Sequence, residues 1–219
     1  MERILEPELM DDDRQARAYA HADFSTSNQW FVDHLVADFP AALRSVVDLG
    51  CGPADVVIRL ARTKPGVHIT AIDGAAAMIA IARDAVQAAG LEQRITLIEG
   101  YIPGVPLADD AFDAILSKDF LHHLPDPMVL WHEVRRIGKP SAVVYIMDLF
   151  RPATPDDARA IVERVAAGEA PILKTDFFNS LCAAFTPTEV EDQLRAASLP
   201  LTVEPVSERH MLIKGILAG

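Results

Sequence analysis

The chain has 219 residues, of which 50% are hydrophobic, and a formal net charge of −12. These values fit one α/β domain with a large core and argue against wholesale disorder. Because Lys and Arg nowhere form a cluster, we expect neither nucleic acid nor an anionic membrane surface as a partner. The amino terminus lacks the apolar core of a signal peptide, and no apolar run reaches the roughly 20 residues of a membrane span. We therefore expect a soluble, cytoplasmic protein.

The first part of the chain carries two helical patterns, over residues 12–21 and 25–39. In the second, Trp30, Phe31, Leu35 and Val36 are spaced for one helix face. Ser25 or Ser27 stands where the second helix needs a capping side chain. We expect residues 1–43 to form a helical cap on a larger domain.

From residue 44 to residue 219, strand and helix patterns alternate. Strands separated by single helices predict a parallel sheet with helices on both faces. The expected strands are 45–49, 67–72, 94–99, 112–117 and 141–148, and the expected helices between them are 53–62, 75–89 and 126–137.

The carboxyl-terminal part differs from this alternation. A mostly helical stretch over 154–185 comes before Thr186-Pro187-Thr188-Glu189, which matches a capping box with proline at the first helical position. Two further strand patterns, 201–206 and 210–217, are close enough to pair antiparallel. We expect a parallel sheet that ends in an antiparallel hairpin.

The most informative stretch is Val46-Val47-Asp48-Leu49-Gly50-Cys51-Gly52-Pro53-Ala54-Asp55. A β-branched run ends in an acid, meets two glycines one residue apart and leads into a helical pattern. Glycine allows the tight turn and a close approach of backbone to a ligand. The following helix directs its amides and the positive end of its dipole to the same place. We therefore expect a nucleotide-like ligand at this turn.

Three acids narrow the choice of ligand. Asp55 stands where a dinucleotide fold has its third glycine, and an acid beside a pyrophosphate is unfavourable, so an NAD-type oxidoreductase is the weaker alternative. Asp73 follows the turn by about 20 residues, where an acid can accept both ribose hydroxyls; its other reading is a cap for the next helix. Asp48 is placed to orient an ammonium group. Together they indicate a nucleoside that carries an amino acid and no phosphate.

At this point the sequence resembles the class I S-adenosylmethionine-dependent methyltransferases. The resemblance covers roughly residue 44 to the carboxyl terminus. It implies a doubly wound α/β sheet of seven strands, mostly parallel with the last one antiparallel. It also implies S-adenosyl-L-methionine as cofactor and S-adenosyl-L-homocysteine as product. The residues that carry it are Val46 to Gly52, Asp73, Phe112-Asp113-Ala114-Ile115-Leu116-Ser117, Leu121-His122-His123-Leu124-Pro125-Asp126-Pro127 and the terminal hairpin.

The expected cofactor site lies at the ends of the first four strands. Met78 has a second reading as a core residue of its helix, and Lys118 either meets the cofactor carboxylate or pairs with Asp119. Tyr101 and Ile102 depart from the pattern of many relatives, which have an acid there for the adenine amine. The candidate cofactor-binding residues are Asp48, Gly50, Cys51, Gly52, Asp73, Gly74, Met78, Gly100, Tyr101, Ile102, Ser117 and Lys118.

Candidate residues for chemistry and substrate lie beside this site. His122 follows the fourth strand and is a candidate general base, the alternative being that it only shapes its loop. Asp148 and Arg151 follow the fifth strand and are candidate substrate contacts at the mouth of the crevice, or else a surface ion pair. Tyr19 and Phe24 are candidate lid residues.

The function we expect is in-line methyl transfer to a small-molecule acceptor. The alternatives are an enzyme that modifies the cofactor itself and a non-catalytic protein that binds S-adenosylmethionine or S-adenosylhomocysteine. No His/Cys/carboxylate spacing suggests a metal site, and Cys51 and Cys182 do not suggest a disulfide scaffold. Phe177-Phe178-Asn179 is a candidate second wall of the substrate pocket. The sequence leaves the acceptor and the oligomeric state open.

Overall fold

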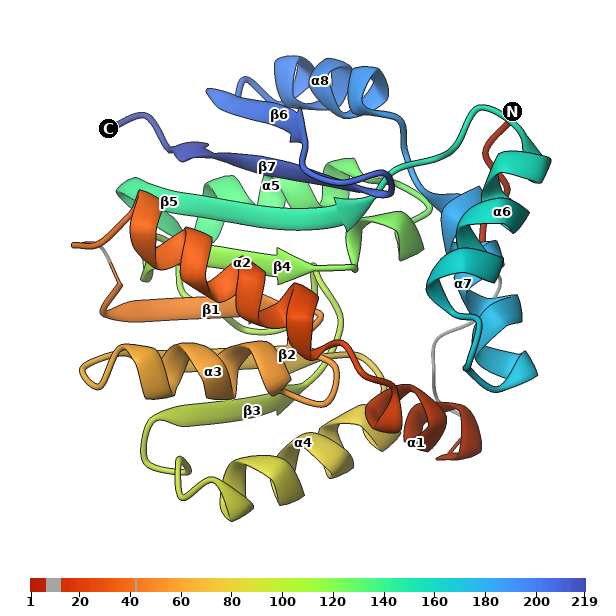
Figure 1. The fold of residues 1–219 in the computed structure, drawn as a ribbon. Coiled ribbons are helices and arrows are strands. Elements are labelled where there is room, and N and C mark those ends of the chain that lie inside the picture. The colour runs from red at the N-terminus through yellow and green to blue at the C-terminus, as the bar shows by residue number, and fades with distance from the viewer. Residues whose placement is uncertain (7–12, 42) are drawn as a thin grey trace.

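A seven-stranded sheet forms the centre of the molecule, in the order β3-β2-β1-β4-β5-β7-β6 (Figure 1). The computed structural model describes residues 1–6, 13–41 and 43–219. β7 runs antiparallel to both of its neighbours, and the other strand pairs are parallel. The predicted fold, a doubly wound sheet with an antiparallel last strand, is confirmed.

The elements follow the expected ranges closely. The strands are β1 (Ser45–Leu49), β2 (His68–Asp73), β3 (Ile95–Glu99), β4 (Phe112–Lys118), β5 (Gly138–Leu149), β6 (Leu201–Pro205) and β7 (His210–Ile216). The helices are α1 (Asp13–His21), α2 (Ser25–Asp38), α3 (Asp55–Thr63), α4 (Ala76–Ala88), α5 (Met128–Ile137), α6 (Pro155–Val165), α7 (Pro171–Ala183) and α8 (Pro187–Ala196), with a 3₁₀ turn η1 (Leu121–His123). The main difference is β5, which begins three residues before the predicted start at Ser141.

The central strands are apolar along their length because helices cover both faces of the sheet. Successive side chains of a strand point to opposite faces. Val46 accordingly packs in the core beneath α2, α3 and α4, whereas Val47 packs with Trp131 of α5 in the core on the other face. Because Phe31 of α2 belongs to the first of these cores, α2 is part of the packed fold.

The start of α2 differs from the prediction. Neither Ser25 nor Ser27 caps the helix, since the residue before it is Phe24 and no side chain caps its amides in the usual way. Instead, the Asp23 carboxylate accepts a hydrogen bond from the Ser25 amide (2.9 Å). Asp23 and Phe24 thus form the break between α1 and α2.

The helical stretch predicted over 154–185 is two helices, α6 and α7. The predicted capping box of α8 is confirmed, with Thr186 and Glu189 bonded reciprocally. In Figure 1, α1, α6 and α7 lie together at the end of the sheet to which the parallel strands point. In the described part of the chain, no helix combines the length and the apolar character that crossing a membrane requires.

Candidate functional site

The carboxyl ends of β1, β2 and β4 border a cavity of about 740 Å³, called here the first cavity. This is where ligands bind in open α/β sheets. Eleven of the twelve candidate cofactor residues line it: Asp48, Gly50, Cys51, Gly52, Asp73, Gly74, Met78, Gly100, Tyr101, Ile102 and Lys118. Met78 also packs against Ala16 of α1, so its core reading holds as well.

The two glycines of the turn are needed for different reasons. Both have left-handed backbone, with φ of +79° at Gly50 and +52° at Gly52. A Cβ on Gly50 would lie 2.6 Å from the ring of Phe120, whereas one on Gly52 would meet nothing within 4 Å. Gly50 is therefore needed because the Phe120 ring packs against its Cα, whereas Gly52 leaves open space at the wall of the first cavity.

Asp73 ties the glycine turn to the helix that follows β2. One carboxylate oxygen accepts a hydrogen bond from the Gly52 amide (2.8 Å), and the other accepts one from the Ala75 amide (2.9 Å). Burial raises the pKa of Asp73, against the lowering effect of these two hydrogen bonds. Asp73 thus caps the helix that follows, which is one of its two predicted readings. The same carboxylate also lines the first cavity, where the other reading requires it to be.

Asp48 is a buried acid without a full set of partners. It is 2% exposed, and within the described residues its Oδ1 has no hydrogen-bond partner. Burial, and then the negative charge of Asp73, raise the pKa of Asp48 to about 7. A buried polar atom without a partner is costly. At the wall of a cavity it suits a ligand that brings a cationic donor, so Asp48 and the glycine turn fit the amino-acid end of S-adenosylmethionine.

Asp55 lines the first cavity at the position of the third dinucleotide glycine. Its carboxylate accepts hydrogen bonds from Asn28 of α2 and Arg59 of α3, both at 2.8 Å. The acid therefore links two helices, and Arg59 balances part of its charge. Ala54, just before it, is buried with φ of +70°, a conformation that favours glycine.

Ser117 and Arg151 are predicted site residues that line neither the first cavity nor the second cavity described below, and the same holds for Asp148. Ser117 is fully buried, and its hydroxyl donates to the Leu49 carbonyl (2.7 Å), so it joins β4 to β1. Arg151 was expected at the mouth of the crevice, but it is buried and donates to the Ala184 carbonyl (2.8 Å) and the Glu189 carboxylate (2.6 Å). The expectation that Ser117 contacts the cofactor is corrected, because Ser117 and Lys118 point to opposite faces of one strand. The expectation that Arg151 lies at the crevice mouth is also corrected, because its ion pair is with Glu189 of α8.

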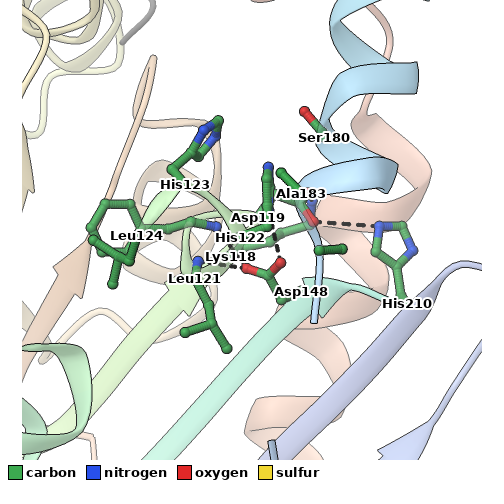
Figure 2. Close-up of polar contacts among 12 residues, drawn as sticks. Lys118, Asp119, Leu121, His122, His123, Leu124, Asp148, Ser180, Ala183 and His210 are labelled. Atoms are coloured by element: carbon green, nitrogen blue, oxygen red, sulfur yellow. Dashed lines mark hydrogen bonds and ion pairs between the residues drawn. The ribbon is translucent and has the colours of Figure 1, made fainter. Parts of the chain in front are cut away.

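His122 and Asp148 form a buried pair at the end of β5 (Figure 2). The His122 Nδ1 lies 2.7 Å from one Asp148 oxygen, and the other oxygen accepts hydrogen bonds from the amides of Phe120 (2.8 Å) and Leu121 (2.7 Å). Burial lowers the pKa of His122, but the Asp148 charge outweighs it, so the net direction is upward. Asp148 lines neither cavity, which corrects the expectation that it meets substrate at the crevice mouth.

A second cavity of about 360 Å³ shares a wall with the first. Tyr19 and Phe24 border both, with ring centroids 4.7 Å apart, and Asp119 and His123 border both as well. The residues that line only the second cavity include His122, Trp30, Met147, Leu149, Leu173, Phe177, Arg209 and His210. The two predicted lid residues thus lie where the cavities meet, and Phe177, which was predicted to form part of a substrate-pocket wall, lines the second cavity.

Asp119 is a site residue that the sequence reading did not single out for a role of its own. Its backbone is left-handed, with φ of +55°. Its carboxylate pairs with Lys118 and lies 3.4 Å from the His210 Nε2. Burial raises the pKa of Asp119, but the neighbouring Lys118 charge holds it well below its usual range. Lys118 therefore pairs with Asp119, one of its two predicted readings.

Glu6 is a second residue that sequence reasoning missed, because no local motif surrounds it. It lines the first cavity, and its carboxylate accepts from the His123 Nδ1 (2.9 Å). Glu6, His122 and His123 offer one ligand-type atom each within 4.8 Å of one another, a spacing that could hold a metal ion. Here Glu6 is bonded to His123 and Ser180, and His122 is bonded to Asp148.

Comparison with known proteins finds a methyltransferase domain within this chain. Residues 47–146 match the sequence profile of a family described as a methyltransferase domain. Methyltransferase GfsG of Streptomyces halstedii is 33% identical over 124 residues, 56% of this chain and 44% of that protein. Demethylmenaquinone methyltransferase of Listeria welshimeri is 31% identical over 112 residues, 51% of this chain and 47% of that protein. The chain thus spans less than half the length of these two relatives.

Solved structures agree on the fold. The plantazolicin methyltransferase BpumL in complex with SAH superposes with a TM-score of 0.74 at 16% identity, covering 96% of this chain and 92% of that one. At that identity the likeness shows the fold alone. The matched domain contains the glycine turn, Asp73 and His122, and the sheet has the seven strands and the antiparallel last strand expected from the resemblance. The chain thus contains a stretch, residues 47–146, that matches a methyltransferase domain, and it resembles the class I S-adenosylmethionine-dependent methyltransferases in sequence and fold.

Proposed function

We propose that this chain transfers the methyl group of S-adenosylmethionine to a small-molecule acceptor that occupies the second cavity. The observation that carries the proposal is the pair of adjoining cavities. Asp48, Gly52 and Asp73 line the first, and His122 lines the second. The names of GfsG and demethylmenaquinone methyltransferase support the reaction type.

In the first cavity, the proposed roles of the two acids follow from their unused acceptor capacity. An ionised carboxylate has about four lone-pair sites, so Asp73 can accept ribose hydroxyls while keeping its bonds to Gly52 and Ala75. The unpartnered Oδ1 of Asp48 can orient the ammonium group, directly or through water. Exposed Tyr101, at 58%, can cover the adenine by packing. When bound, S-adenosylmethionine supplies a methyl group already activated by the positive sulfur.

Between the cavities, the chain must align the acceptor and exclude water. Tyr19 and Phe24 stand at this junction and can close over both ligands. Holding reactants in line can supply on the order of 7–11 kcal/mol at best. Oriented binding is therefore the main contribution that we assign to the protein.

For an acceptor that arrives protonated, His122 is the proposed general base. Its Nδ1 is committed to Asp148, so Nε2 is the nitrogen that remains to take a proton. Asp148 is then a positioning residue that fixes the tautomer and stabilises the protonated ring. The apolar and aromatic side chains of the second cavity, among them Trp30, Leu173 and Phe177, fit an acceptor with an apolar body.

The proposal is tested first by cofactor binding. Calorimetry with S-adenosylhomocysteine is expected to show binding, and Asp73→Ala is expected to weaken it strongly. Thermal-shift measurements should show a larger stabilisation by S-adenosylhomocysteine than by NAD. Absence of binding, or an Asp73→Ala variant that binds as tightly as the parent, would contradict the proposal. Turnover with a panel of small hydroxyl and amine acceptors, followed by S-adenosylhomocysteine release, tests the reaction itself.

A further inference from the structure

Residues 1–6 connect two parts of the site that lie far apart in the sequence. Arg3 donates from Nη2 to the carbonyls of His122 and Leu124, both at 2.9 Å, and from Nε to the Ala183 carbonyl at the end of α7 (2.5 Å). Its guanidinium also lies 3.7 Å from the centroid of the Phe185 ring. One planar side chain thus holds the η1 turn against the end of α7.

Glu6, in the same segment, reaches the histidines of that turn. Its side chain is 9% exposed, and one of its oxygens accepts from the His123 Nδ1 at 2.9 Å. The Ser180 hydroxyl of α7 donates to the other oxygen (3.1 Å). The His123 ring then packs against the His122 ring, with centroids 4.1 Å apart and planes at 38°.

These contacts form one continuous row of side chains. Asp148 holds His122 from one end through a 2.7 Å hydrogen bond, and Glu6 holds His123 from the other. In Figure 2, Asp148 is drawn below the labelled His122 and His123, and Ser180 lies to their right. The ring face of His122 is therefore placed by His123, whose orientation depends on a residue more than a hundred positions away in the sequence.

We propose that Glu6 is a positioning residue for His122, acting through His123, and that Arg3 anchors the segment which carries it. The inference deepens the proposed function, since His122 is the proposed base. It adds the amino-terminal segment to the machinery of the site, although that segment lies outside the residues matched by the methyltransferase profile.

The electrostatics of the row supports a test by titration. The charges of Asp148, Asp119 and Glu6 each raise the pKa of His122 against its burial. Gln at position 6 keeps the size and the acceptor oxygen but removes the charge. The other titratable or charged groups on the walls around His122 are His123 of η1, Asp23 between α1 and α2, Glu169 and Asp176 at α7, and Arg209 and His210 at β7.

The experiment measures the His122 titration by NMR in the ligand-free protein with labelled histidine, assigned with His122→Gln. In Glu6→Gln we expect the midpoint to move to lower pH than in the parent. Glu2→Gln, the same change at an exposed position of the same segment, should leave it in place, and Glu6→Asp should largely restore it. Equal midpoints in Glu6→Gln and Glu2→Gln would overturn the proposal.

The role of Arg3 is tested in a double-mutant cycle. In an Arg3→Gln background the segment loses its anchor, so Glu6→Gln should shift the midpoint less than it does alone. A shift of full size would overturn the anchoring role. A change of the parent's titration on adding EDTA would mean that the three side chains hold a metal ion, which would also overturn the hydrogen-bonded row.

Far-UV circular dichroism shows first that each variant is folded. Calorimetry of the parent with S-adenosylhomocysteine is run in parallel. No binding in that experiment, with the Glu6→Gln shift intact, defeats the proposed function and leaves the positioning role standing. Binding of S-adenosylhomocysteine by the parent, without any shift of the His122 midpoint in Glu6→Gln, defeats the positioning role and leaves the proposed function standing.

Discussion

The two cavities are built in different ways. The first is made largely of short-range structure, with Asp48, Gly50 and Gly52 within five residues and Asp73 at the end of the neighbouring strand. The second brings Phe24, His122, Phe177 and His210 together from four separate parts of the chain. A motif can specify the first locally, whereas the second depends on how α1, α7 and η1 pack. The first cavity, the proposed cofactor side, is therefore the readable half of the molecule, and the second cavity, the proposed acceptor side, is the assembled half.

The largest expected effect concerns the assembled half. In Asp148→Asn, one amide group must serve two backbone donors and His122 Nδ1, so a buried donor is left unpaired or the His122 tautomer reverses. We expect a loss of about 1–3 kcal/mol in unfolding free energy and a fall in turnover on the order of a hundredfold or more. Urea unfolding and the ¹⁵N shifts of His122 measure the stability and the tautomer. Exposed Asp84→Asn is the matched control, and an unchanged tautomer together with an unchanged unfolding free energy would contradict the prediction.

The next effect separates the two glycines of the readable half. Gly50→Ala combines a left-handed φ with a Cβ 2.6 Å from Phe120, so we expect a loss of about 2–4 kcal/mol in unfolding free energy. Gly52→Ala carries only the backbone cost, about 1–2 kcal/mol, but places a methyl group toward the first cavity. We expect it to weaken S-adenosylhomocysteine binding more than its stability loss suggests. Equal stability losses would show that Phe120 gives way.

Asp48 supplies a pH-dependent test of the first cavity. Its pKa is raised from 3.8 to about 7, so its contribution to stability is fully present below the unfolded-state value and is lost as pH rises through about 7. Asn does not titrate, so the Asp48→Asn variant lacks this loss of stability with rising pH. The unfolding free energy of the parent, relative to the variant, should therefore fall between pH 4 and pH 8. A pH-independent difference would contradict the raised pKa, while weaker S-adenosylhomocysteine binding by the variant would support the ammonium role.

The smallest effect is expected at Ala54. Its φ of +70° costs about 1–2 kcal/mol for a residue with a Cβ, whereas glycine costs about 0.5–1 kcal/mol more in chain entropy. Ala54→Gly should therefore raise the unfolding free energy by about 0–1.5 kcal/mol. Thermal unfolding measures it, with S-adenosylhomocysteine affinity expected to stay the same. A destabilised variant would mean that the Ala54 methyl group contributes packing which outweighs the strain.

Prediction from sequence succeeded for residues whose role follows from their immediate neighbours in the chain. The strand–glycine–helix pattern placed Gly50, Gly52 and Asp73 at one end of the sheet, and the structure agrees. It failed for Ser117 and Arg151, because the face of a strand and the choice of a distant partner are not visible in a short window. Glu6 had no local signal, since its partners His123 and Ser180 lie on other elements.

The sequence by itself determined the order of strands and helices along the chain, the resemblance to a methyltransferase family and the end of the sheet where the first cavity lies. It did so because hydrophobic periodicity and glycine conformation are properties of neighbouring residues. Only the tertiary structure decided that Asp148 serves His122 and that the amino-terminal segment reaches the histidine turn. Those contacts join residues far apart in the chain, and they form only when buried polar groups find their partners in the packed protein.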